Sequence, residues 1–150
     1  MTARLDRRQL LQFGAGAVLV ASFPISADAE PEDLMAVRTE LFGDRPINQG
    51  RVNVKLPPIS ENGYSVPITI NVDSPMTESN YVKQVVVLSP ENPLPNIARF
   101  QFTPVSGRAE VATRIRLSAT QALQVIAEMS DGSLWSGGAE TVVTLAACVI

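Results

Sequence analysis

The feature that most constrains the fold is a period-two alternation of apolar and polar residues, which recurs from Arg51 onward. Its clearest instance is residues 66–72, where Val66, Ile68, Ile70 and Val72 alternate with other residues. Such alternation places the apolar side chains on one face of a half-buried strand. Similar short runs, separated by turn residues, lie at 52–56, 81–88, 97–103, 110–117, 123–129, 134–135 and 141–145. This pattern predicts an all-β fold, an immunoglobulin-like antiparallel β-sandwich without the usual pair of core cysteines.

Glycine-containing turns are expected between these strands. Glu61-Asn62-Gly63 and Asp131-Gly132 are typical of loops or hairpins in which glycine supplies a positive φ. Gly137-Gly138 is expected to separate a short strand at 134–135 from the last strand at 141–145.

One helix is expected before the strands, over residues 30–43. Leu34, Val37 and Leu41 recur at helical spacing, and Gly43 suits the left-handed conformation that ends a helix. A helix of this length is marginal by itself, so its apolar stripe must pack on other structure. The sequence leaves open whether that structure is this domain or a partner.

Residues 1–29 are predicted to be a twin-arginine export signal. Arg7-Arg8 precedes two leucines, an apolar stretch follows, and Ala27-Asp28-Ala29 resembles a cleavage site. The apolar stretch is shorter than the roughly 20 residues that span a bilayer. We therefore predict a periplasmic protein with no membrane span, in which residues 30–145 form one domain.

Composition excludes several classes of function. The chain has 12 Lys+Arg, 15 Asp+Glu and a formal net charge of −3, which argues against a nucleic-acid partner. It has no histidine, which rules out a Cys-His couple and a Ser-His-Asp triad. Its carboxylates are scattered, so neither a metal site nor a catalytic acid-base constellation is predicted. We expect no cofactor, and no enzymatic activity of the chain itself.

The single cysteine, Cys148, is the candidate functional residue. It lies in a C-terminal arm, residues 146–150, together with Ala146, Ala147, Val149 and Ile150. A lone cysteine in an oxidising compartment is free, bonded to another molecule, or a carrier of a covalent group. Most free cysteines are buried and inert, whereas an untethered terminus is exposed. The sequence leaves both states open, including a disulfide between two copies.

Two other features have more than one interpretation. Arg114 and Arg116 lie two residues apart on a strand and must share a face. That face is either simply solvated or a patch for an acidic partner or an anionic sulfur ligand. Trp135 is expected in the core rather than at a ligand site.

An ordered set of motifs along the chain resembles the SoxY family, the sulfur-carrier subunits of the periplasmic thiosulfate-oxidising system. The resemblance covers nearly all of the chain after the export signal. Besides that signal and the helix, it rests on Glu61-Asn62-Gly63 with Val66-Pro67, Asp73-Ser74-Pro75-Met76, Asn92-Pro93, Thr113-Arg114-Ile115-Arg116 and Ser130-Asp131-Gly132-Ser133-Leu134-Trp135.

The resemblance implies a function and partners. Cys148 would carry sulfur intermediates covalently, in a heterodimer with a SoxZ-like subunit. The carrier would visit a c-type cytochrome complex, a manganese-dependent hydrolase that releases sulfate, and a sulfur dehydrogenase. Which sulfur species it carries is left open.

The arm departs from the family pattern, which ends Gly-Gly-Cys-Gly-Gly, and this difference indicates a SoxY-related subgroup with an Ala-Ala-Cys arm. Alanine in place of glycine removes backbone freedom, and Val149 and Ile150 stiffen the chain further. Leu145, Ala147 and Val149 could even prolong the last strand.

We therefore predict a periplasmic sulfur carrier that uses Cys148. The alternative is a non-carrier β-sandwich interaction subunit whose Cys148 is buried at an interface.

Overall fold

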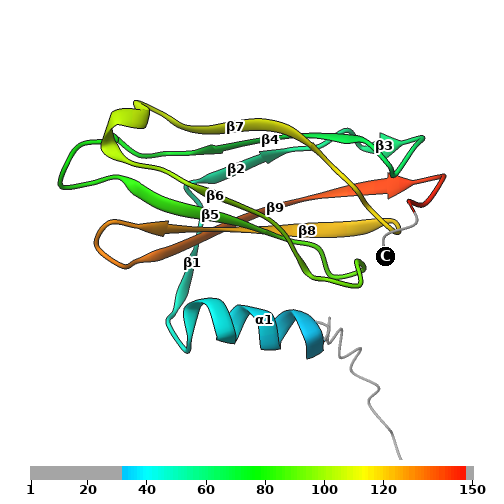
Figure 1. Cartoon of the computed structure of the whole chain (residues 1–150), viewed down its shortest axis with the longest axis horizontal. Coiled ribbons are helices and arrows are strands. Elements are labelled where there is room, and N and C mark those ends of the chain that lie inside the picture. The colour runs from blue at the N-terminus through cyan, green and yellow to red at the C-terminus, as the bar shows by residue number, and fades with distance from the viewer. Residues whose placement is uncertain (1–31, 148–150) are drawn as a thin grey trace, which may run out of the picture.

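The computed structural model describes residues 32–147 (Figure 1), which form two β-sheets and one helix. The elements, in chain order, are α1 (Glu32–Phe42), β1 (Ile47–Gln49), β2 (Val52–Lys55), β3 (Ile59–Ser60), β4 (Val66–Val72), β5 (Val82–Leu88), β6 (Asn96–Gln101), the 3₁₀ turn η1 (Pro104–Ser106), β7 (Ala109–Ile115), β8 (Gln121–Met129) and β9 (Leu134–Val143).

The strands form a sandwich of a six-stranded and a three-stranded sheet. The larger sheet has the order β1-β9-β8-β5-β6, with β3 also paired to β9, and the smaller has the order β2-β4-β7. Pairing is antiparallel except that β1 and β3 both run parallel to β9. The predicted all-β sandwich with one helix is confirmed.

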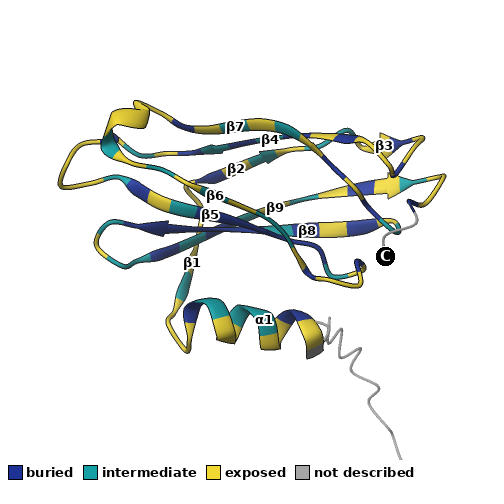
Figure 2. Cartoon of the chain, in the orientation of Figure 1, coloured by how far each residue is buried: buried dark blue, intermediate teal, exposed yellow. Residues whose placement is uncertain are grey.

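The main core lies between the facing sides of the two sheets. The four aliphatic residues of β4 that were predicted to share a face are 0–3% exposed, and they pack with Leu123, Val125 and Ala127 of β8. Figure 2 shows the buried residues along the inner strands and the exposed ones at the edges and loops. The alternation in the sequence therefore predicted correctly which side chains face inward.

A second apolar cluster fixes the helix on the outer face of the larger sheet. Leu34 and Phe42 of α1 pack with Val86, Ile126 and Leu134. The helix thus packs within its own domain, which the sequence could not decide. Its cap is as predicted: Gly43 has a φ of 65°, and its N–H donates to the carbonyl oxygen of Thr39 at 2.8 Å.

Arg45 holds the end of the helix to the sheet. Its Nε donates to the carbonyl oxygen of Phe42 at 2.8 Å, and its Nη1 lies 3.0 Å from Glu128 Oε1. Burial alone would raise the pKa of Glu128. Hydrogen bonds from Arg45 and Gln84 and the nearby charge of Lys83 outweigh burial and lower that pKa below its ordinary value.

The expected break at Gly137-Gly138 is wrong, because β9 runs without interruption from Leu134 to Val143. These glycines do not form a turn; they let the backbones of neighbouring strands approach β9 closely. A Cβ added at Gly137 would overlap the carbonyl oxygen of Val52, and one at Gly138 would overlap that of Leu123. The absence of side chains lets neighbouring strands come within backbone contact of β9.

Two strands, β1 and β3, were not predicted. They span three and two residues, which is too short for a visible alternation. Both exist because they add to the edge of β9, and β3 does so close to the C-terminal end of that strand.

Candidate functional site

The candidate site is the place where the C-terminal segment leaves the sandwich. Strand β9 ends at Val143, and the chain then bends at 144–145. The last strand, predicted at 141–145, therefore ends two residues earlier, and Leu145 does not prolong it. The bend is held by Thr144, whose N–H donates to the carbonyl oxygen of Ser60 and whose hydroxyl donates to that of Glu61, both at 3.1 Å.

Beyond the bend, three segments of the chain converge through backbone hydrogen bonds. The Gly63 N–H donates to Leu145 O at 2.7 Å, and the Leu117 N–H donates to Gly63 O at 2.9 Å. The Ala147 N–H then donates to Leu117 O at 3.0 Å. We call this meeting point of Gly63, Leu117 and residues 145–147 the arm junction.

Only glycine fits at position 63 of the arm junction. An added Cβ would overlap Leu117 O and would lie 2.9 Å from the nitrogen of Ala147. The expectation that Gly63 supplies a positive φ is wrong, although Gly132, in the other predicted turn, has a φ of 82°. Gly63 is required because three backbones meet there, which the local sequence does not show.

The arm junction leaves less free chain than the predicted arm of residues 146–150. Ala146 is exposed, but Ala147 is only 5% exposed and is bonded to Leu117. The first two arm residues therefore belong to the folded body. Cys148, Val149 and Ile150 lie outside the described residues, and Cys148 directly follows the last anchored residue.

The end of β9 is supported from both sides. On the β3 side, the buried hydroxyls of Ser60 and Thr141 share a hydrogen bond of 3.0 Å. On the β8 side, the Val143 N–H donates to Thr120 Oγ1 at 2.9 Å. These two hydrogen bonds tie the end of β9 to the segments on either side of it.

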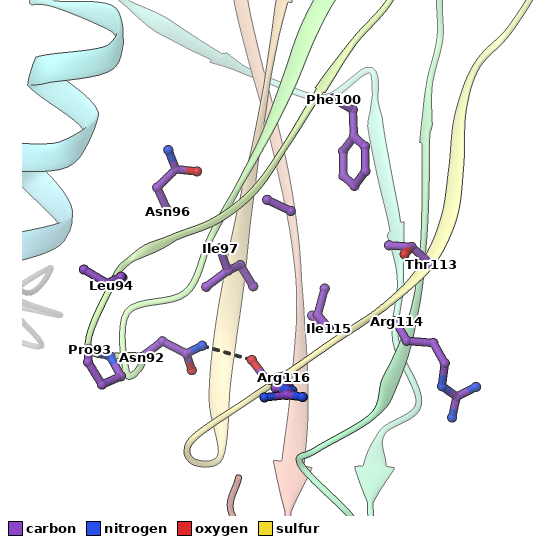
Figure 3. Close-up of a pocket in the computed structure, with 11 residues that line it drawn as sticks. Asn92, Pro93, Leu94, Asn96, Ile97, Phe100, Thr113, Arg114, Ile115 and Arg116 are labelled. Carbon is purple, nitrogen blue, oxygen red and sulfur yellow. Dashed lines mark hydrogen bonds between the residues drawn. The ribbon is translucent and has the colours of Figure 1, made fainter. Parts of the chain in front are cut away.

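A cleft of about 500 Å³ opens between β6 and β7, the edge strands of the two sheets (Figure 3). Its wall is largely apolar and includes Ile97, Phe100 and Ile115. At one end Asn92 donates through Nδ2 to the carbonyl oxygen of Arg116 at 2.9 Å. Since Arg116 precedes Leu117, this end of the cleft adjoins the arm junction.

Arg114 and Arg116 are both exposed, but only Arg114 lies on β7, which ends at Ile115, and the environments of the two side chains differ. Arg114 donates through Nε to Ser65 Oγ at 2.6 Å and through Nη2 to Ser65 O at 3.0 Å. Figure 3 shows its side chain directed away from Ile97. Arg114 is thus held against β4, while Arg116 lies at the cleft end near Asn92.

Trp135 is half-buried rather than enclosed. Its ring packs against the main core, and the guanidinium of Arg51 lies 4.5 Å from the ring centroid. This is the geometry of a cation–π contact, so one face of the ring is covered by a charged side chain.

The described part of the chain, residues 32–147, offers no group of three side chains placed to hold a metal ion. Within the same residues, no helix has the length and apolar character needed to cross a membrane.

The fold and the arm junction define a class of protein: an immunoglobulin-like β-sandwich, buttressed by one helix, whose C-terminal segment is tied to the body one residue before a cysteine. The chain belongs to the SoxY family, since the family model described as "Sulfur oxidation protein SoxY" matches residues 38–148. That match extends through Cys148.

Solved structures agree with this assignment. The sulfur carrier protein SoxY from Chlorobium limicola f thiosulfatophilum is 29% identical, with a TM-score of 0.63 over 75% of this chain and 97% of that one. A superoxide reductase (neelaredoxin) from Ignicoccus hospitalis is 14% identical, with a TM-score of 0.57 over 65% of this chain and 94% of that one. The superoxide reductase from Nanoarchaeum equitans is 17% identical, with a TM-score of 0.50 over 63% of this chain and 99% of that one. At these identities the two reductases share only the fold. No curated protein matched the chain.

Proposed function

We propose that this protein is a sulfur carrier whose Cys148 covalently holds sulfur intermediates while separate enzymes act on them. Membership of the SoxY family carries the proposal, because the family match reaches the only cysteine of the chain. The likeness to the Chlorobium sulfur carrier supports it. So does the arm junction, which anchors the chain immediately before Cys148.

The proposed chemistry needs no catalytic group in the carrier. A thiolate at Cys148 joins the sulfane sulfur of thiosulfate, forming one S–S bond and releasing two electrons to a c-type cytochrome complex. Water then attacks the terminal sulfonate sulfur, and the S–S bond to that sulfur breaks. Sulfate and two protons are released, and a persulfide anion remains on Cys148. A manganese-dependent hydrolase performs that second step. The carrier supplies only an accessible thiol, whose thiolate is the reactive form.

The protein works in the periplasm, after export by the twin-arginine route that residues 1–29 direct. It pairs there with a SoxZ-like subunit. One of the two alanines of the Ala-Ala-Cys arm has a structural reason in this chain: the Ala147 side chain is buried at the arm junction, where glycine would leave unfilled space, whereas Ala146 is exposed. The last hydrogen-bonded residue of the described chain, Ala147, thus directly precedes Cys148 in the sequence.

The test is mass spectrometry of the protein purified from its native host after growth on thiosulfate. We expect adducts that add sulfane sulfur or sulfonate to Cys148 and that disappear with a thiol reductant. The matched control is Cys148→Ser, which should fold identically and carry none. A uniformly unmodified thiol during thiosulfate oxidation would refute the proposal.

The burial of Ala147 favours one alternative, in which Cys148 continues into an interface of a non-carrier subunit. Labelling distinguishes the two functions. Rapid reaction of Cys148 with a bulky maleimide in the native complex excludes the buried-cysteine alternative, and a complete lack of reaction favours it.

A further inference from the structure

Exposed apolar side chains gather around the arm junction. Seven large apolar residues in the described chain are substantially exposed: Met35, Ile59, Tyr64, Leu94, Val105, Val142 and Leu145. Four of these, with exposed fractions of 43–61%, lie on the segments that form or flank the arm junction. We call the four the apolar collar: Ile59, Tyr64, Val142 and Leu145.

The backbone brings the collar residues close in two pairs. Ile59 and Val142 are directly paired in the parallel register of β3 and β9, so their side chains lie next to each other on one face. Leu145 accepts a hydrogen bond from Gly63, the neighbour of Tyr64. Val105, by contrast, lies on η1, and Figure 1 places the coil between β6 and β7 at the opposite end of the sandwich from β3.

Any protein that encloses the thiol of Cys148 must also contact the apolar collar, because only one peptide unit separates Cys148 from the arm junction. Ala147 is bonded to Leu117, and one peptide unit, about 3.8 Å between Cα atoms, separates it from Cys148. An active site that surrounds the sulfur of Cys148 must therefore press against the residues around the arm junction. Those residues expose apolar surface, whose burial is the main favourable contribution to protein association.

We propose that the apolar collar docks against an apolar rim around the active-site entrance of the enzymes that load and unload sulfur on Cys148. This inference rests on the proposed carrier function and adds a recognition surface to it. A small collar suits a carrier that serves several enzymes, because interfaces of limited area are typical of transient encounters.

The experiment compares a collar variant with an exposed apolar control in the full chain. The collar variant is Ile59→Thr/Val142→Thr/Leu145→Gln, in which threonine keeps the β-branched shape at both strand positions. The control is Val105→Thr, since Val105 is 94% exposed. Each replaces the native protein in its host, thiosulfate is added as a pulse, and mass spectrometry follows the Cys148 adducts over time.

We expect adduct formation and consumption to slow at least tenfold in the collar variant and to stay within about twofold of wild type in the control. Labelling of the purified proteins with N-ethylmaleimide should be equal, because the thiol itself is unchanged. Equal adduct kinetics in collar variant and control would overturn the inference while leaving the carrier function intact. Leu145→Gln alone, outside any strand, gives a second test if the triple variant folds poorly.

Two further outcomes decide against the collar as an enzyme-docking surface. If wild type self-associates and the collar variant becomes monomeric with unchanged adduct kinetics, the occupant is a second copy. If wild type carries no adduct at all, the carrier function fails and the inference fails with it.

Discussion

Gly63→Ala is the most direct perturbation of the arm junction. The new methyl would overlap the carbonyl oxygen of Leu117 and would lie 2.9 Å from the nitrogen of Ala147. Both atoms belong to the backbone, so no side-chain rotation relieves the overlap. Leu117 is fully buried, whereas residues 145–147 are the last of the described chain. We therefore expect the terminal segment to detach while the sandwich stays folded.

The magnitude follows from the interactions that detachment breaks. Two backbone hydrogen bonds, from Gly63 to Leu145 and from Ala147 to Leu117, are worth about 1 kcal/mol each. Detachment also returns the methyl of Ala147 to water, at about 0.8 kcal/mol. A local loss of about 2–3 kcal/mol is below the usual global stability of about 5–15 kcal/mol. It corresponds to a roughly 30- to 150-fold larger population of the open segment.

Hydrogen exchange measures this opening. Protection of the Ala147 amide should fall by this roughly 30- to 150-fold factor in Gly63→Ala, and a bulky maleimide should label Cys148 faster. The matched control is Gly107→Ala. Gly107 has a φ of 72° but no atom within 4 Å of an added Cβ. The Gly107→Ala variant should have a free energy of unfolding about 1 kcal/mol lower, because of backbone strain, and the protection of its Ala147 amide should be unchanged. Unchanged Ala147 protection in Gly63→Ala, with a melting temperature no lower than that of Gly107→Ala, would refute the assigned role of the glycine.

Three other substitutions test the fold that supports this site. The lowered pKa of Glu128 means that its carboxylate contributes stability above its ordinary value of 4.5, and that this contribution is lost as pH falls through the folded value. Glu128→Gln should remove that part of the acid dependence, as measured by urea unfolding between about pH 3 and pH 6. Gly137→Ala should reduce the free energy of unfolding by about 3 kcal/mol or more, because the methyl overlaps the Val52 carbonyl; a thermal melt within a few degrees of wild type would contradict this. Thr141→Val leaves the buried Ser60 hydroxyl without its partner and should lower the free energy of unfolding by about 1–3 kcal/mol in chemical denaturation. No loss there would mean that the Ser60 hydroxyl finds another hydrogen-bond partner.

The fold could be predicted where the sequence pattern is local. The period of two in residues 66–72 fixed which side chains enter the core, because successive side chains of a strand point to opposite faces. The helix and its end at Gly43 were predictable for the same reason, since helical spacing and a left-handed cap are properties of neighbouring residues. Cys148 was identifiable as the candidate carrier residue because the chain has no other cysteine.

The candidate site was predictable only in part. Its cysteine stands out in the sequence, but the arm junction depends on Leu117 and Ala147, which meet only in the folded chain. The one local signal is Gly63, and the sequence around it indicates only a turn. The apolar collar was not predicted either. A single exposed valine or isoleucine has no sequence signature, and Ile59 meets Val142 only through the register of β3 with β9.

The sequence by itself determined the sandwich class, the helix and the candidate carrier residue, because these depend on periodicity, capping and composition. Only the tertiary structure decided that the helix packs on its own domain, that Gly137 and Gly138 continue a strand, and that the chain is anchored at Ala147. In each of these cases the deciding contact joins residues far apart in the chain. Phe42 of α1 packs with Ile126, the Val52 carbonyl lies against Gly137, and the Leu117 carbonyl binds Ala147. A residue's neighbours in sequence limit its conformation, but its neighbours in space decide which conformation has room and a hydrogen-bond partner.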